Sequence, residues 1–482
     1  MKDFTAYLNE IGEVGEIVKV VQMMAWVEGL PGVRLGERVV LETGQEGEVT
    51  SLAADLAEVL IVAAQMPKVG VRVARTGEKL KVPVGEAILG KTVDGMGRVI
   101  GGDGVKAEGM EWREVDVVPA GITVRHRVSR ALETGVILVD LMIPVGRGQR
   151  ELVMGDRKTG KSMMLLKMVV TQARLGSVCI YAAIGKKKTE IKRVEEYFKK
   201  MGVQGNVVLV GAGSHDGAGE IFIAPYTAMT MAEYFRDKGR DVLVVLDDMS
   251  THAKFYREIA LVGRRFPGRD SYPGDIFYTH SKLLERAGNF VGDGKETAIT
   301  CLPVVETTGG DFTGYIQTNM MSMTDGHIYF DLDLYSSGRR PAINPFISVT
   351  RVGKQTQSKL RREISQKTLE LLNDYEKTQG FLRFGAELSD NSRQIISMGN
   401  RVLKFFDQPM DVTVPVNVQT VLWGALWAGV WEGKNMEKLV GAYESDAGLR
   451  TMVNNIVINS DSVQTLLASV REKSEQLLGV MA

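Results

Sequence analysis

The chain of 482 residues has little of what would tie it to an oxidising compartment or to nucleic acid. Two cysteines are too few for a disulfide framework, so we expect a reducing compartment. Lys plus Arg and Asp plus Glu each number 59, and this balance gives no indication of nucleic acid as the main partner. The five histidines are scattered without ligand spacing, which argues against a transition metal held by the protein.

Long hydrophobic runs are also missing. The most apolar early stretch, residues 52–64, is interrupted by Asp55 and Glu58 and is too short to span a bilayer. The first residues lack the basic and then apolar regions of a secretory signal. We therefore expect no direct membrane insertion, and any association with a membrane must come through partners.

One motif with a specific chemistry is present. A phosphate-binding loop, GxxxxGK[ST], lies between a short apolar strand at 151–154 and an apolar helix that starts near residue 163. Its residues are Gly155, Asp156, Arg157, Lys158, Thr159, Gly160, Lys161 and Ser162. Loop amides and a helix N-terminus together donate hydrogen bonds to phosphate oxygens. Lys161 would reach the terminal phosphates and Ser162 would bind magnesium. The alternative is a glycine-rich turn without a ligand.

A second acidic anchor for magnesium follows another apolar run. Residues 242–246 are all apolar and lead into Asp247 and Asp248. A continuous apolar run that ends in Asp is typical of a central parallel strand whose carboxyl end faces a ligand. We expect Asp247 to serve the metal, whereas the position of Asp248 fits a cap on the next helix equally well.

A catalytic base is missing where one would be needed. The apolar run at 178–184 continues through Gly185 into Lys186, Lys187 and Lys188, and no carboxylate follows the glycine. A protonated lysine can screen phosphate charge but cannot accept a proton from the attacking water. These lysines either face phosphate or form a solvated turn. In both cases the pattern predicts binding of nucleotide without cleavage by this chain alone.

With these features the chain resembles the alpha subunits of rotary F-type ATP synthases over roughly residues 10 to 410. The matching segments are residues 134–140, 146–150, 266–287, 306–307, 324–326, 340–344 and 348–353. The resemblance implies an N-terminal antiparallel β-barrel, a central α/β phosphate-loop domain of the RecA-like type and a C-terminal α-helical domain. Residue patterns place these three parts at 1–73, 74–355 and 356–482.

The resemblance also implies roles for single residues. Lys161, Ser162 and Asp247 would hold ATP or ADP with Mg²⁺ in a non-catalytic site, and Arg340 and Pro341 would lie beside the adenine, with Gln408 nearby. Lys186 stands where alpha subunits usually carry Gln and catalytic beta subunits carry Glu.

Arg351 resembles the arginine finger that an alpha subunit inserts into the neighbouring beta site. The implied partners are three beta subunits in an alternating ring, a gamma shaft and, in addition, delta with the peripheral stalk. Residues 266–275 would lie against gamma. The implied location is the cytoplasmic face of a bacterial plasma membrane, where the complex couples ATP synthesis or hydrolysis to proton or sodium transport.

Two other interpretations stay open. A homohexameric phosphate-loop motor, such as an RNA translocase or a protein-export ATPase, would share the loop and the finger but would need its own catalytic carboxylate. A catalytically active relative would need Glu190 or Glu306 as its base. In the helical part, Trp423, Trp427 and Trp431 are spaced four apart, which predicts one packed helix face.

Overall fold

The computed structural model describes residues 2–101, 109–292, 294–383, 389–409, 412–432 and 435–481. Two compact units are present, and each combines three stretches of the chain. The first unit contains residues 1–127, 148–154 and 173–325, and the second contains residues 128–147, 155–172 and 326–482.

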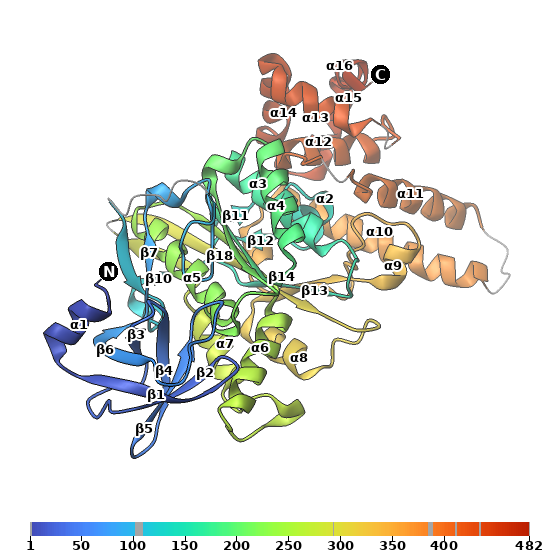
Figure 1. Cartoon of the computed structure of the whole chain (residues 1–482). Coiled ribbons are helices and arrows are strands. Elements are labelled where there is room, and N and C mark those ends of the chain that lie inside the picture. Colours follow the sequence, from blue (N-terminus) through green and yellow to red (C-terminus); the bar gives the residue numbers. More distant parts are fainter. Residues whose placement is uncertain are drawn as a thin grey trace. The chain divides into compact units, whose positions relative to one another are not determined.

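A closed antiparallel barrel follows the first helix, α1 (Phe4–Ile11), in the blue part of Figure 1. The barrel order is β1 (Val14–Val21), β2 (Met24–Glu28), β5 (Leu56–Ile61), β4 (Glu46–Leu52), β3 (Glu37–Leu41) and β6 (Arg72–Lys79). Ile17, Val39 and Val59 are fully buried inside it. Alternation of inward and outward side chains along each strand explains this small core.

A mostly parallel sheet forms the centre of the first unit. Its strands lie in the order β13 (Glu151–Gly155), β18 (Lys295–Glu306), β16 (Val242–Asp247), β14 (Val178–Lys186), β15 (Val207–Gly213) and β8 (Thr92–Val93). β18, β16, β14, β15 and β8 pair in parallel. Carboxyl ends of parallel strands meet at one edge of a sheet. Lys186, Asp247 and Glu306 therefore end neighbouring strands at the same edge.

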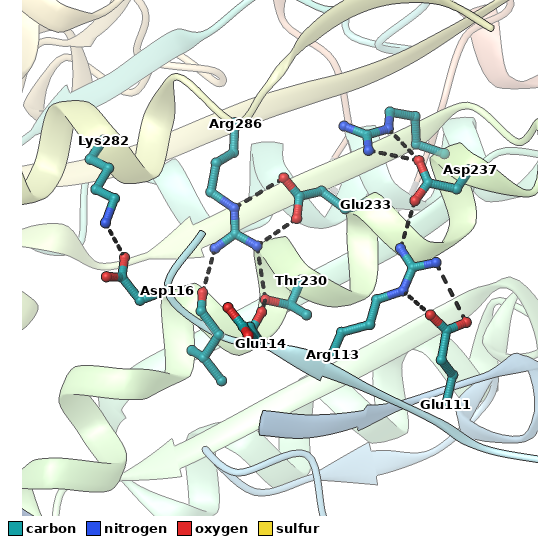
Figure 2. A network of polar contacts seen from close by, with 11 residues as sticks. Glu111, Arg113, Glu114, Asp116, Thr230, Glu233, Asp237, Lys282 and Arg286 are labelled. Carbon is teal, nitrogen blue, oxygen red and sulfur yellow. Dashed lines mark hydrogen bonds and ion pairs between the residues drawn. The ribbon is translucent and has the colours of Figure 1, made fainter. Parts of the chain in front are cut away.

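Helices and shorter strands complete the first unit. They are β7 (Lys81–Val84), β9 (Glu111–Glu114), β10 (Arg125–His126), β17 (Gly288–Gly292), α4 (Lys188–Lys200), α5 (Ala218–Asp237), α6 (Met249–Val262), α7 (Ile276–Leu284) and α8 (Tyr315–Met323), with 3₁₀ turns at Glu86–Ile88, Ile122–Val124, Gln204–Asn206 and Arg269–Ser271. α5 packs on β14, β15 and β16. Figure 2 shows polar contacts that fasten α5 to β9 and to Arg286, just after α7.

The second unit contains the phosphate-loop helix and the C-terminal helices. Its elements are β11 (Ala131–Leu132), α2 (Ile137–Met142), β12 (Val145–Gly146), α3 (Lys161–Arg174), β19 (Gly326–Phe330), α9 (Leu332–Ser336), β20 (Val349–Thr350), a 3₁₀ turn at Gly353–Thr356, α10 (Lys359–Arg383), α11 (Asp390–Phe406), α12 (Val416–Trp427), α13 (Met436–Ser445), α14 (Ala447–Ile458), α15 (Val463–Glu472) and α16 (Ser474–Met481). α12 is apolar on most of its surface and packs against α13, α14 and α15, as expected for a buried helix.

The prediction that the three tryptophans share one packed helix face is only partly correct. Trp423 and Trp427 stack on α12 with ring centroids 4.6 Å apart, but the helix ends at Trp427. Gly429 adopts a left-handed conformation, with φ of 76°, and turns the chain away. Trp431 therefore lies beyond the helix and packs edge-on against Phe405.

The predicted fold class is confirmed: an antiparallel barrel, an α/β nucleotide-binding fold and C-terminal helices are all present. The boundaries at residues 73 and 355 stay predictions, because the two compact units interleave along the chain. In the ranges that the structure describes, no helix combines the length and the apolar character needed to cross a membrane.

Candidate functional site

The phosphate-loop sequence forms a strand, loop and helix. β13 ends at Gly155, and α3 begins at Lys161. Gly155 must be glycine because an added Cβ would lie 2.6 Å from the carbonyl oxygen of Phe330 on β19. Lys158 has a positive φ of 64°, which is uncommon for a residue with a side chain. Residues in such conformations are found more often than elsewhere in loops that bind ligands. The local fold is thus the one that the motif requires.

Two lysines of the loop differ in environment. Lys161 is only 8% exposed, and its Nζ donates to the carbonyl oxygens of Gly155, at 2.6 Å, and Asp156, at 2.5 Å. Lys158, in contrast, is exposed, as is Ser162 in the first turn of α3. The loop's own carbonyl oxygens thus hold the Lys161 ammonium where a phosphate would have to compete for it.

A cluster of charged and polar side chains occupies the edge of the sheet where β14 and β16 end. We call it the acid-pair cluster, and it consists of Asp247, Asp248, Lys186 and Tyr181. Lys186 Nζ lies 2.8 Å from Asp247 Oδ1 and 3.3 Å from Asp248 Oδ2. Tyr181 on β14 donates its hydroxyl to Asp247 Oδ2 at 2.6 Å. Both aspartates are at least 96% shielded from solvent, with exposures of 4% and 3%.

Asp248 also begins the next helix. It is the N-cap of α6, and its Oδ1 accepts a 2.6 Å bond from the backbone nitrogen of Thr251. The capping role that the sequence left open for Asp248 is therefore present. Each of the four carboxylate oxygens of Asp247 and Asp248 accepts a bond from within the unit.

The two aspartates keep Lys186 and Tyr181 in their protonated forms. Burial alone would lower the pKa of Lys186, but the carboxylates of Asp247 and Asp248 outweigh it and raise that pKa above its usual value. Burial and the adjacent Asp247 charge likewise raise the pKa of Tyr181 well above its usual value. At neutral pH the cluster thus holds a charged ammonium and a protonated phenol, and neither can act as a base.

The sequence pointed to Lys186, Asp247 and Asp248, but it did not predict that they pair with one another. It offered Lys186 as a phosphate neighbour or a solvated turn, whereas the structure places its ammonium on the acid pair. Lys188 does face solvent, with 72% of its side chain exposed. Tyr181 was missed entirely. A tyrosine inside a continuous apolar strand was the only available signal, because a buried hydroxyl needs a partner.

The two residues named as alternative bases lie in different places. Glu190 is exposed in the first turn of α4 and accepts a 3.3 Å bond from the backbone nitrogen of Lys187, as a helix-capping acid does. Glu306 ends β18 next to β16, and its backbone nitrogen donates to Ser250 Oγ at 2.9 Å. Glu306 thus stands at the same sheet edge as Asp247.

The residues predicted to lie beside adenine are brought together within the second unit. The backbone nitrogen of Gln408 donates to the carbonyl oxygen of Arg340 at 2.9 Å. Arg340 Nη1 donates to the carbonyl oxygen of Tyr335, and its guanidinium lies 3.8 Å from the centre of that ring. Lys167 on α3 donates to the carbonyl oxygen of Pro409 at 2.6 Å, which links the phosphate-loop helix to this segment.

Gln408 itself is committed to the fold. It is 2% exposed, and its amide donates to the carbonyl oxygens of Gly135 and Val412 while its Oε1 accepts from the backbone nitrogen of Ile137. Both N–H groups of its amide are thus in use, whereas its Oε1 has a second lone pair. The role assigned to Gln408 beside the base stays a prediction.

Arg351 follows β20 directly and is exposed. The turn around it is firmly held. Thr350 Oγ1 donates to the carbonyl oxygen of Pro144 at 2.8 Å and accepts from the backbone nitrogen of Gly353 at 3.1 Å. An added Cβ at Gly353 would lie 1.6 Å from that same Pro144 oxygen, so only glycine fits. A turn held by these bonds thus places Arg351 at the surface.

Comparisons with known proteins agree with this picture. Residues 135–350 match the model of the ATP synthase alpha/beta family, nucleotide-binding domain. The chain is 40% identical over 401 residues to the ATP synthase subunit alpha of Wolinella succinogenes, covering 83% of this chain and 80% of that protein. It is also 40% identical over 417 residues to the ATP synthase subunit alpha of a Sulfurovum species, covering 86% of this chain and 82% of that protein.

Proposed function

This chain belongs to the family of ATP synthase alpha subunits, and on that premise we propose that it is the regulatory, non-catalytic subunit of a rotary F-type enzyme. Like its family, it binds nucleotide and works in ATP synthesis as one subunit of a larger complex. We also propose the residues of its nucleotide site and its partner subunits.

The nucleotide is held by the phosphate loop. Backbone amides from Gly155 to Ser162 and the Lys161 ammonium bind its phosphates, and Arg340 and Pro341 lie beside the base. The local fold supports this assignment, because the loop lies between β13 and α3 and Lys158 has a positive φ of 64°. Lys161 exchanges its two carbonyl partners for phosphate oxygens when nucleotide binds.

Magnesium fits only part of the proposed ligand set. Ser162 is exposed and available at the start of α3, but both oxygens of Asp247 already accept bonds, from Lys186 and from Tyr181. Over the part of the chain that the structure describes, no three His, Cys, Asp or Glu side chains gather as metal ligands. When bound, magnesium neutralises phosphate charge. Asp247 would serve the metal beside these bonds, because each of its oxygens has a second lone pair.

The observation that carries the non-catalytic role is the position of Lys186. Its ammonium stands at the end of β14, where the family resemblance puts the glutamate of catalytic subunits, and it lies against Asp247. An ammonium cannot take a proton from water or orient it as a carboxylate does. Nucleotide bound by this chain therefore serves assembly and regulation.

Arg351 acts outside its own chain. We assign it to the catalytic site of an adjacent beta subunit, where a guanidinium stabilises the charge of the transferring phosphoryl group. Three alpha and three beta subunits alternate around gamma, and delta joins the peripheral stalk.

The loop 266–275 is the segment expected to contact gamma. Phe266, at its start, is 95% exposed, which supports this contact. The complex lies on the cytoplasmic face of a bacterial plasma membrane and moves protons or sodium ions.

Turnover of a reconstituted complex with beta and gamma subunits tests the assignment of Arg351. Arg351→Ala should lower multisite turnover by about 10³ to 10⁵, which corresponds to ~4 to 7 kcal/mol of barrier, while nucleotide binding by this chain persists. Arg351→Lys should rescue poorly, because an ammonium lacks the planar fork. Arg393→Ala, at an arginine on α11 with 69% of its side chain exposed, is the matched control. Wild-type turnover by Arg351→Ala, together with loss of turnover in Lys161→Ala, would mean that the two sites are assigned the wrong way round.

A second candidate function is ATP hydrolysis by this chain itself, as in a homohexameric motor. The place of Glu306 at the sheet edge next to β16 is the observation in its favour. Steady-state ATPase activity of the purified chain that is lost in Glu306→Gln and in Lys161→Ala would establish it. We expect turnover near background and a chain that does not form a six-membered ring without beta.

A further inference from the structure

The turn that carries Arg351 is attached on both sides to one neighbouring segment. Before the arginine, Thr350 Oγ1 donates to the carbonyl oxygen of Pro144, shortly after α2, at 2.8 Å. After the arginine, the side-chain amide of Gln357 donates to two carbonyl oxygens in the last turn of α2. Residues 350–357, α2 and Pro144 all belong to the second unit. Arg351 therefore lies on a short loop whose two ends rest on the same helix end.

Gln357 bonds to a part of α2 that needs hydrogen-bond donors from outside the helix. The last four carbonyl groups of a helix have no partner within it, so other groups must bond to them. The Gln357 amide lies 3.2 Å from the carbonyl oxygen of Asp140 and 3.4 Å from that of Leu141. Arg361 Nη2 adds a bond of 3.1 Å to the Asp140 oxygen. Gln357 is only 4% exposed, so bulk water would not simply replace its amide.

The helix α2 is itself held in place by a buried carboxylate. Asp140 Oδ1 accepts from the backbone nitrogen and the hydroxyl of Thr134, both at 2.8 Å. Its Oδ2 accepts from the backbone nitrogen of Gly135, at 3.0 Å, and from Gln419 Nε2, at 2.7 Å. Two bonds to each oxygen occupy the acceptor sites of a carboxylate. The backbone of α2 thus has little freedom to shift, and a turn attached to its end shares this restriction.

We propose that Gln357 is a positioning residue for Arg351. Together with Thr350 it holds the turn on α2, so that the guanidinium is presented in a fixed direction to the neighbouring catalytic site. The proposal rests on the role assigned to Arg351 above. A misplacement of about 1 Å in a group that acts on the transition state can cost about 10²-fold in rate. Gln357 prevents such a shift without touching nucleotide or the reacting atoms.

A double-mutant cycle on the turnover of the reconstituted complex with beta and gamma subunits tests this role. Gln357→Leu, which removes the amide at similar side-chain volume, should lower multisite turnover by about 10- to 100-fold. The KM for ATP should stay within about threefold, because an interaction made only in the transition state changes kcat and leaves KM unchanged. The dissociation constant of ATP for the purified chain should stay within the same range. Gln366→Leu, at an exposed glutamine on α10, is the matched control and should turn over as the wild type.

The second half of the cycle repeats Gln357→Leu in the Arg351→Ala background. If Gln357 acts through Arg351, the substitution should change the residual turnover there by less than about twofold. A merely structural role would lower turnover by the same factor in both backgrounds, because independent effects add in free energy. If Gln357→Leu does not fold, Thr350→Val decides by the same cycle, since it removes the other attachment of the turn and keeps the shape of the side chain.

Each remaining result would overturn a different statement. Equal factors in the two backgrounds, or turnover by Gln357→Leu within about threefold of the wild type, would overturn the inference while the role of Arg351 stands. Wild-type turnover by Arg351→Ala would refute the role proposed for Arg351, and this inference with it.

Discussion

Two buried ionic clusters of the first unit use their charges in opposite ways. In the first, Arg286 is 1% exposed, and its guanidinium donates to both oxygens of Glu233, to Thr230 Oγ1 and to the carbonyl oxygen of Val115 (Figure 2). We call these four residues the Arg286 cluster. In the second, the acid-pair cluster, one ammonium serves two carboxylates.

The difference teaches that burial and pairing do not by themselves indicate function. In the Arg286 cluster, one cation meets one anion and neutral oxygens, so the charges balance inside the fold. In the acid-pair cluster, one negative charge is left over, and it lies where parallel strands end. We therefore interpret the Arg286 cluster as a purely structural one, a brace that links α5 to Val115 and Arg286, and the acid-pair cluster as part of a ligand site.

Removal of the Arg286 charge should have the largest effect. Arg286→Met leaves Glu233, whose side chain is 13% exposed, as an anion without its cation, and the free energy of unfolding should fall by about 3 to 5 kcal/mol. Urea denaturation measures this loss. Magnesium and nucleotide should stabilise the wild type and Arg286→Met equally, so the difference between the two should persist, because nothing in the Arg286 cluster binds a ligand. A loss below about 1 kcal/mol would place Arg286 among ordinary surface ion pairs.

Removal of the Lys186 charge should cost less and should be reversible. Lys186→Gln leaves two neighbouring aspartates without their cation, and we expect a loss of about 1 to 3 kcal/mol, since the lysine is partly solvated and Tyr181 and Thr251 still donate. Added magnesium should regain much of the loss, because a dication replaces the ammonium. Thermal unfolding with magnesium and with EDTA gives the comparison. An equal response of Arg286→Met to magnesium would remove the distinction between the clusters.

Glu48 on β4 should give a smaller, pH-dependent effect near the edge of the network in Figure 2, where Lys282 pairs with Asp116. Burial and the Asp116 charge raise the pKa of Glu48 to about 7, against the opposing pull of Lys282. An acid with a raised pKa binds its proton more tightly in the folded chain. Stability is therefore lost as the pH rises from about 4.5 to about 7.

The variant Glu48→Gln keeps the neutral form at every pH. It should be more stable than the wild type by about 1 to 2 kcal/mol at pH 8, and the gain should shrink toward pH 5. Denaturation at the two pH values measures it, and Glu16→Gln, at an exposed barrel position, is the control. A gain that grows toward acid pH would contradict the sign derived for Glu48.

The ion pairs of Arg113, which Figure 2 draws beside the Arg286 cluster, should matter least. Arg113 on β9 pairs with Glu111 at 2.7 Å and with Asp237 at 2.6 Å, but both acids are at least 40% exposed. Arg113→Gln should change the free energy of unfolding by less than about 1 kcal/mol, and salt should reduce the effect further. A salt-independent loss as large as that of Arg286→Met would show that the brace extends to the surface.

The sequence by itself determined the local features of this protein. The spacing of Gly155, Gly160 and Lys161 predicted the loop, and the apolar runs before Lys186 and Asp247 predicted buried parallel strands. These signals are readable because a short stretch of backbone depends mainly on its own residues and on how its side chains alternate between core and solvent. The absence of a carboxylate after Gly185 was visible for the same reason.

Only the tertiary structure decided which side chains meet. Lys186 and Asp247 are 61 positions apart, and they touch because β14 and β16 are neighbours in the sheet, which no local pattern specifies. Gln408 shows the same limit. The resemblance puts it near the adenine, which stays a prediction, and only the structure shows that its amide is held by backbone groups near Gly135, far away in the sequence. Burial follows from composition and periodicity, but the partner of a buried polar group follows from strand order and packing.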